Sequence, residues 1–290
     1  GNIRNYGTGE VRFEAPQITP ESTATKPSEV YKPGATLDRT LEYGGKTVPI
    51  YRDRPLNVFS DVDFIWTGEE NENQRRLEYL GGEFRTRYGI DVSSFQGEID
   101  WDAVADDNID FAMVRVGFRG TGTGSLNTDK YYEQNIRGAM RAGLETGVYF
   151  FAQAVTVEEA IEEAEYVISL LDGLDINGPV AYDWEMHDST YRVYGTSPEM
   201  ATACAVGFCQ RIKDAGYTPM VYGGTYVTYM KYDQGALADY LSWYPEYKSE
   251  KSEKLCPTLV YHMDYWQFSS TRAVAGINGR VDMNIQFIRR

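Results

Sequence analysis

The chain has 290 residues, with 43 acidic and 28 basic side chains and a formal net charge of −15 at pH 7. Binding to nucleic-acid phosphates needs clustered Lys and Arg, so this composition argues against a nucleic-acid partner. No apolar run approaches the ~20 residues of a membrane span. With two His and three Cys there are few ligands for a metal, and we expect neither a metal nor a cofactor.

The first 86 residues show no regular alternation of helices and strands. Residues 1–40 are rich in Pro, Thr, Ser, Glu and Lys, which is typical of an extended stalk or linker. Residues 41–86 predict a small accessory segment, to which we can assign no chemistry. Its expected elements are strands at 46–51, 57–59 and 64–66 and a short helix at 70–80.

From Tyr88 onward, apolar strands alternate with amphipathic helices, which predicts a parallel sheet. The expected strands are 89–93, 111–116, 147–151, 180–185 and 220–222, with helices at 129–142, at 156–171 and from Ser197. Three further strands, at 241–244, 260–268 and 281–285, follow without long helices, and the last two resemble a hairpin. The pattern predicts an α/β fold, an irregular TIM-like (β/α)5(β)3 barrel over residues 87–290, with a small N-terminal extension.

Four acidic side chains lie late in, or just after, these apolar strands: Asp91, Asp183, Glu185 and Asp282. Alternate side chains of a strand share a face, so Asp183 and Glu185 point the same way, about 6.5–7 Å apart along the backbone. In barrels of this kind the chemistry gathers at the C-terminal ends of the strands. Glycoside hydrolysis needs such a pair, one acid to protonate the leaving oxygen and one to act at the sugar carbon. The alternative interpretation of two isolated acids at this spacing is that they are hydrated side chains at the end of a strand and have no catalytic role.

Six ordered sequence blocks resemble glycoside hydrolase family 25, the Chalaropsis-type lysozymes. The blocks are Gly89–Gly97 with Ile99–Trp101, Phe111–Arg115, Gly147–Ala152, Asp183–Glu185, Trp266–Ser270 with Val274–Ile277, and Val281–Asn284. The resemblance implies an N-acetylmuramidase that cleaves peptidoglycan at the β-1,4 bond between N-acetylmuramic acid and N-acetylglucosamine.

The same resemblance implies roles for the four acids. Glu185 matches the general acid of the family. Asp183 matches its partner, which either attacks the anomeric carbon or stabilises the 2-acetamido oxygen while that oxygen attacks; the resemblance favours the second, substrate-assisted route. Asp91 and Asp282 match flanking acids with electrostatic and orienting roles, and the alternative for both is a structural Asp in an ion pair.

The expected substrate-binding residues are aromatic and amide side chains at or near strand ends: Tyr149, Phe151, Tyr222, Trp243, Tyr247, Gln96 and Gln267. Some of these rings must belong to the core, and Gln267 has the alternative of satisfying backbone groups. We expect Arg115 to pair with a structural acid. The block Trp243–Tyr247 departs from the Trp-Ile-Ala-x-Tyr-like pattern of many family members, and residues 248–254 form a charged loop, so the shape of the sugar subsites is expected to differ.

By the same resemblance, the partner is the peptidoglycan glycan strand and the location is extracellular or at the cell wall, with the leader absent from this sequence. We expect a monomer. Residues 41–86 have two possible roles, as a wall-binding appendage or as a brace for the barrel. One alternative function is a chitinase-like hexosaminidase, but its motif carries further acids where this chain has Val180–Tyr182. The other is a non-catalytic wall-binding protein, which the presence of all four acids disfavours.

Overall fold

The computed structural model describes residues 24–68 and 74–290, and its centre is a closed barrel of hydrogen-bonded strands. In order around the ring the strands are β5 (Phe84–Val92), β6 (Phe111–Arg119), β8 (Glu145–Ala152), β9 (Val180–Trp184), β10 (Pro219–Tyr222), β11 (Leu241–Pro245), β12 (Tyr265–Arg272) and β13 (Val281–Arg289). Neighbouring strands run parallel except at β12–β13 and β13–β5, which are antiparallel.

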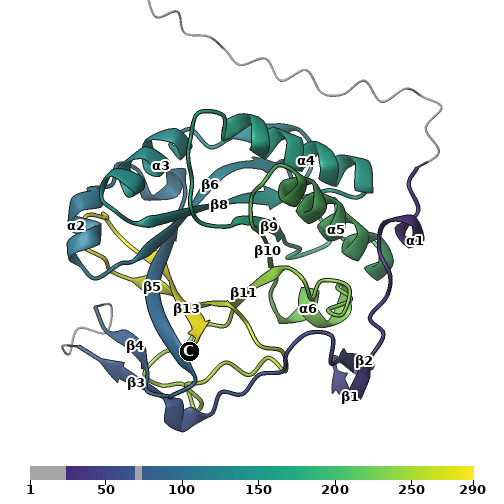
Figure 1. The fold of residues 1–290 in the computed structure, drawn as a ribbon, viewed down its shortest axis with the longest axis horizontal. Helices are drawn as coiled ribbons and strands as arrows, with labels where there is room; N and C mark the ends of the chain where they lie inside the picture. The colour runs from purple at the N-terminus through teal and green to yellow at the C-terminus, as the bar shows by residue number, and fades with distance from the viewer. Residues whose placement is uncertain (1–23, 69–73) are drawn as a thin grey trace, which may run out of the picture.

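A helix follows each of the first five barrel strands. These helices are α2 (Trp101–Asp106), α3 (Tyr132–Arg141), α4 (Val157–Leu170), α5 (Pro198–Asp214) and α6 (Thr225–Met230), and β7 (Leu126–Thr128) is an extra strand on β6. The caps expected from the sequence are present, since Thr156 Oγ1 accepts from Glu159 N and Ser197 Oγ accepts from Met200 N. The predicted (β/α)5(β)3 barrel is therefore confirmed, with the helices around the upper part of the ring in Figure 1.

The N-terminal segment runs down the right side of Figure 1, beside α5 and α6, and then below the barrel. Its elements are α1 (Pro27–Val30), the hairpin β1 (Leu37–Tyr43) and β2 (Lys46–Tyr51), the short 3-10 turn Asp61–Asp63, and the hairpin β3 (Phe64–Thr67) and β4 (Arg76–Tyr79). Residues 1–23 of the predicted stalk lie outside the described residues. The boundary expected between residues 86 and 87 falls inside strand β5.

Three sequence-based assignments are wrong. Residues 76–79 form a strand rather than part of a helix, because Leu77 is buried and the segment pairs with β3. Residues 57–59 form no strand. The strand expected at 260–268 begins only at Tyr265, because the chain before it pairs with the N-terminal segment: Asn57 N donates to Val260 O at 2.8 Å, and the Asn57 side chain donates to Leu259 O at 2.7 Å.

The β3–β4 part of the N-terminal segment packs on the outer face of the strands that have no helices. The ring of Phe64 meets Trp266 of β12 edge to face, with centroids 5.4 Å apart, and Trp66 lies 6.1 Å from Phe268. The guanidinium of Arg272 stacks 4.3 Å over the Trp66 ring. These residues belong to one continuous apolar core with the helix-covered side of the barrel, so the segment takes the place of the missing helices.

Side-chain alternation along the strands produces a second, smaller core inside the barrel. On β13, Met283 and Ile285 point outward into the large core, so Asp282 and Asn284 between them point inward. The interior is filled by Phe111, Met113, Ala181, Met220, Tyr222, Trp243 and Tyr265. Its floor is tight, because a Cβ on Gly89 would lie 2.2 Å from the Phe111 ring.

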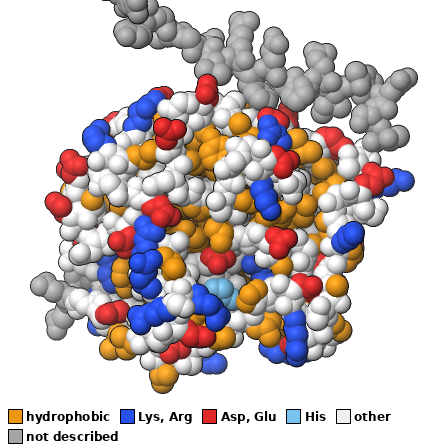
Figure 2. Space-filling model, in the orientation of Figure 1, with side chains coloured by type: hydrophobic (Ala, Val, Ile, Leu, Met, Phe, Trp, Pro, Cys, Tyr) orange, Lys and Arg blue, Asp and Glu red, His pale blue; other side chains and the backbone are white. Residues whose placement is uncertain are grey.

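The surface of Figure 2 carries both signs of charge around its periphery, with hydrophobic side chains visible between the helices. Within the part of the chain that the structure describes, no helix combines the length and the apolar character needed to cross a membrane.

We expect the N-terminal segment and the barrel to unfold in one cooperative transition. Leu77→Ala removes a fully buried side chain from their shared core and should lower the free energy of unfolding by about 2–5 kcal/mol. Leu80→Ala, at a position that is 57% exposed, is the matched control and should change it by less than about 0.5 kcal/mol. Urea titration followed by fluorescence measures both; a separate early transition in the Leu77→Ala protein would contradict the prediction.

Candidate active site

The four predicted acids meet at one end of the barrel. Asp91 and Asp183 lie at the C-terminal ends of β5 and β9, and Glu185 follows β9 directly. Asp282 is the second residue of β13. Because β13 runs antiparallel to β5, its first residues reach the same end of the barrel, where Asp282 pairs in register with Asp91. The four acids form two carboxyl pairs, Asp91 with Asp282 and Asp183 with Glu185.

The first pair is held by amide donors. Asp91 Oδ2 accepts from Asn284 Nδ2 and from Gln267 Nε2, each at 2.8 Å, and Asp91 also accepts a hydrogen bond from Asp282. Burial raises the pKa of Asp91 to about 6 against the opposing effect of these donors. Burial and the charge of Asp91 raise the pKa of Asp282 to about 8. At neutral pH, Asp282 therefore keeps its proton and donates it to the Asp91 carboxylate.

The second pair also shares a hydrogen bond. Burial, followed by the charge of Glu185, raises the pKa of Asp183 well above its usual value. The other oxygen of Asp183, Oδ1, is buried and has no hydrogen-bond partner among the described residues. Because a second negative charge beside Glu185 is costly, the deeper Asp183 keeps its proton in the free protein and shares it with Glu185 through this hydrogen bond. The positive charge of Arg115 lowers the pKa of Asp183 and so opposes the effect of burial. Arg115 itself forms an ion pair with Asp129 at 2.8 Å, as expected from the sequence.

His187 is a site residue that the sequence analysis did not identify. Its Nε2 lies 3.0 Å from Glu185 Oε2, and its ring meets Tyr191 edge to face at 5.3 Å. The signal was the spacing Glu-Met-His, which places both side chains on one face if the chain stays extended past the strand.

Gln267 joins the acids to the aromatic wall. Its Nε2 donates to Asp91, while its Oε1 accepts from Tyr222 Oη at 3.0 Å and from Tyr247 Oη at 3.1 Å. Gln267 therefore satisfies side chains of the site rather than backbone groups. Tyr247 is 53% exposed and provides an open ring face beside the acids.

The other predicted binding residues differ in accessibility. Trp243 is 2% exposed and lies beneath Tyr149 and Tyr222, with centroids 5.8 and 4.9 Å away; its Nε1 donates to Asn284 Oδ1 at 2.7 Å. Phe151 is half-buried and pairs in register with Asp183.

The side chain of Gln96 makes a local hydrogen bond: its Oε1 accepts from Ser93 N at 2.8 Å and closes the 3-10 turn Ser94–Gln96. Beside this turn, Phe95 is 85% exposed and packs on the Arg115 guanidinium.

A pocket of about 340 Å³ opens beside the acids. It is lined by residues that follow the ends of β9, β10 and β11, among them Glu185, His187, Tyr222, Thr225 and Tyr247. Its size is that of small-molecule sites, and it combines aromatic walls with a few polar groups. In the described part of the chain, no group of three or more His, Cys, Asp or Glu side chains is arranged to hold a metal ion.

The raised pKa values predict a pH dependence of stability. Between about pH 4 and pH 8 the unfolded Asp282 has lost its proton while the folded one keeps it, so stability should fall as the pH rises through this range. Asp282→Asn cannot ionise and should raise the melting temperature at pH 8 but not at pH 4. Asp239→Asn, at an exposed position, is the control. Equal effects of Asp282→Asn at both pH values would disprove the assignment of the proton.

Comparison with known proteins identifies the family of the chain. The family model "Glycosyl hydrolases family 25" matches residues 90–277. The autolytic lysozyme of Clostridium acetobutylicum is 26% identical over 197 residues, covering 68% of this chain and 54% of that protein. Lysozyme M1 of Streptomyces globisporus is 27% identical over 201 residues, covering 68% of this chain and 66% of that protein.

Among solved structures, the lysozyme of Streptomyces coelicolor is similar with a TM-score of 0.55 and 25% identity, covering 68% of this chain and 90% of that one. The chain thus spans about half the length of the Clostridium relative and most of the Streptomyces structure. The family match covers most of the barrel and includes three of the four acids, and the resemblance inferred from the motifs is confirmed. The chain belongs to family 25 of the glycosyl hydrolases.

Proposed function

We propose that this chain is a peptidoglycan hydrolase of the lysozyme type, an N-acetylmuramidase that cleaves the β-1,4 bond between N-acetylmuramic acid and N-acetylglucosamine. The observation that carries the proposal is the convergence of two hydrogen-bonded carboxyl pairs on a pocket with an exposed tyrosine wall, in a family 25 barrel. The relatives named as lysozymes support the substrate class. All the proposed catalytic groups lie in residues 87–290, which we propose as the catalytic unit, with residues 41–86 as its brace.

Glu185 is the proposed general acid. It lines the pocket, whereas Asp183 is buried behind it, so Glu185 is the member of the pair that reaches a glycosidic oxygen. When a glycan covers Glu185 and excludes water from it, the charge on that carboxyl becomes more costly. The shared proton then moves along the hydrogen bond from Asp183 to Glu185, which gives it to the leaving oxygen.

Asp183, once ionised, is the proposed stabiliser of the reacting sugar. In the substrate-assisted route it orients the 2-acetamido group and stabilises the positive charge that develops as the acetamido oxygen attacks; in the alternative route it attacks the anomeric carbon itself. Its Oδ1 is buried and has no hydrogen-bond partner among the described residues, so either route requires the Asp183 side chain to become accessible when the glycan binds. Asp91, held as a carboxylate by its amide donors, and the protonated Asp282 determine the net charge beside Asp183 and Glu185.

The reaction product tests the bond that is cleaved. Digestion of purified cell wall should release new reducing ends of N-acetylmuramic acid. Reducing ends of N-acetylglucosamine would instead indicate a chitinase-like hexosaminidase, and the absence of new ends would indicate a binding protein. Mass spectrometry after borohydride reduction distinguishes the three outcomes.

Glu185→Gln should lower turnover of wall glycan by about 10²–10⁴-fold while glycan binding stays near wild type, because the amide keeps the size but loses the transferable proton. A dinitrophenyl leaving group departs without a proton, so an aryl glycoside of the same disaccharide should restore much of the rate. Asp183→Asn is the matched comparison. It should cleave both the wall glycan and the dinitrophenyl glycoside slowly. Near-wild-type cleavage of wall by Glu185→Gln would reject the assignment.

His187 is a proposed positioning residue for Glu185. With its ring held against Tyr191, it fixes the orientation of the Glu185 carboxyl group through Oε2. The His187 side chain is 64% exposed, so the expected effect of His187→Ala is small, about a two- to fivefold loss of kcat with KM unchanged. His187→Gln should recover part of the loss, and the dinitrophenyl substrate should show none. A loss that persists with that substrate would contradict the positioning role.

A further inference from the structure

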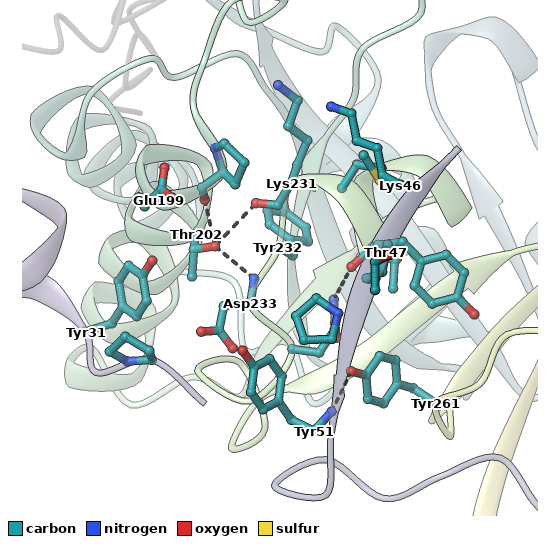
Figure 3. A pocket seen from close by; sticks show the side chains of 18 residues that line it. Tyr31, Lys46, Thr47, Tyr51, Glu199, Thr202, Lys231, Tyr232, Asp233 and Tyr261 are labelled. Atoms are coloured by element: carbon teal, nitrogen blue, oxygen red, sulfur yellow. Dashed lines mark hydrogen bonds between the residues drawn. The ribbon is translucent and has the colours of Figure 1, made fainter. Parts of the chain in front are cut away.

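A second cavity lies on the flank of the barrel and is separate from the carboxyl pairs. Its volume is about 350 Å³, and we call it the flank cavity. One wall comes from the N-terminal segment and includes Tyr31, Lys46 and Tyr51; the other comes from α5 and from the chain after α6 and includes Thr202, Lys231 and Asp233 (Figure 3). Helix α6 lies between the two sites, because its first residues line the active-site pocket and its last residues line the flank cavity.

The two walls of the flank cavity are fixed to each other by direct hydrogen bonds. Gly34 N donates to Asp233 Oδ2 at 2.9 Å, and Tyr51 N donates to Tyr261 Oη at 3.1 Å. At Gly34 any larger residue is excluded, because its Cβ would lie 2.9 Å from Asp233 Oδ1 and 3.0 Å from Gly235 Cα. The cavity is therefore formed before any ligand arrives, which lowers the entropic cost of binding.

Two lysines at the cavity lack a carboxylate partner. No ion pair of Lys46 or Lys231 occurs within residues 24–68 and 74–290, and Lys231 Nζ donates only to the neutral carbonyl of Thr196, at 2.7 Å. Burial, followed by the charge of Lys46, lowers the pKa of Lys231. The two ammonium groups therefore repel each other, in a chain with a net charge of −15. An anion placed between them would remove this repulsion.

The acids of the cavity lie away from the lysines. Figure 3 shows the side chains of Lys46 and Lys231 reaching toward one end, with Asp233 toward the other end and Glu199 to one side, on α5. Asp233 accepts from the backbone N–H groups of Gly34, Gly235 and Ala236, which offset part of its charge. The flank cavity thus offers a positive end, a negative end and tyrosine walls between them.

We propose that the flank cavity binds the free end of the peptidoglycan stem peptide, a diamino acid followed by two D-alanine residues. The C-terminal carboxylate lies against Lys46 and Lys231, the methyl groups lie on the tyrosine walls, and the side-chain ammonium lies toward Glu199 and Asp233. The assignment of this peptide, among short zwitterionic peptides, rests on the proposed function. Its consequence is that the N-terminal segment contributes directly to recognition of the wall.

The test is calorimetric binding of the free pentapeptide L-Ala–γ-D-Glu–L-Lys–D-Ala–D-Ala to the full chain. We expect Lys231→Met and Lys46→Met each to weaken binding by about tenfold, since each removes a charged hydrogen-bond donor to the carboxylate. Lys251→Met, in the exposed loop after β11, is the matched control and should bind as the wild type does. The same peptide with a C-terminal amide should bind the wild type about tenfold more weakly.

The affinity of the flank cavity for the peptide does not depend on catalysis, so Glu185→Gln should bind the peptide as tightly as the wild type does. The proposal is overturned, whatever the activity of the enzyme, if the peptide does not bind at a concentration of about 10 mM. It is also overturned if the wild type and Lys46→Met bind the peptide with equal affinity. Lys46→Met changes only an exposed side chain of the β1–β2 hairpin, so the variant should fold as the wild type does. Equal affinity for the acid and the amide overturns it as well. If the peptide binds as expected while Glu185→Gln still cleaves wall, the catalytic assignment fails and the flank cavity remains a peptide site.

Discussion

The energetic cost of placing four carboxyl groups at one end of a barrel is the constraint on which the site depends. Negative charges at close range in a poorly hydrated space cannot all ionise, and the protein resolves this by sharing protons within two pairs. The buried amides of Gln267 and Asn284 hold the carboxylate of Asp91, which is the ionised member of its pair. Their own partners, two tyrosines and Trp243, then fix the aromatic wall, so charge and shape are set by one hydrogen-bond network.

The N-terminal segment covers an apolar outer face of the barrel that no helix covers among the described residues. Strands β11 to β13 have no helices among the described residues, and their outer faces carry large rings such as Trp266 and Phe268. A bare face of this kind would expose a contiguous apolar surface. The segment before β5 supplies Phe64 and Trp66 to cover it, and the same segment builds one wall of the flank cavity. Stability and the proposed recognition of the wall therefore draw on the same stretch of chain.

The sequence predicted the barrel because its signals are local. Apolar runs of strand length, alternating with capped helices, define the βα units, and the period of two along β9 and β13 places Asp183 and Asp282 inside. The errors lie where tertiary contacts decide. Residues 76–79 become a strand because β3 offers a partner, and residues 260–264 leave the barrel to pair with Leu56 and Asn57. Likewise, no local pattern indicates that Trp243 would be buried beneath other rings, and the Glu-Met-His spacing places His187 beside Glu185 only if the chain stays extended past β9.

The antiparallel closure of the barrel bears on how the chain folds. Strand β13 completes the ring by pairing with β5, so that Phe84 lies opposite Arg289. The two strands are the first and last of the barrel, and the contacts between them have a very large sequence separation, which slows folding because a long loop must close before the pairing is formed. During synthesis the first seven strands of the barrel leave the ribosome with an open edge on β5. Until residue 289 emerges, that edge is a template for intermolecular pairing, and the nascent chain is most prone to aggregation in this interval.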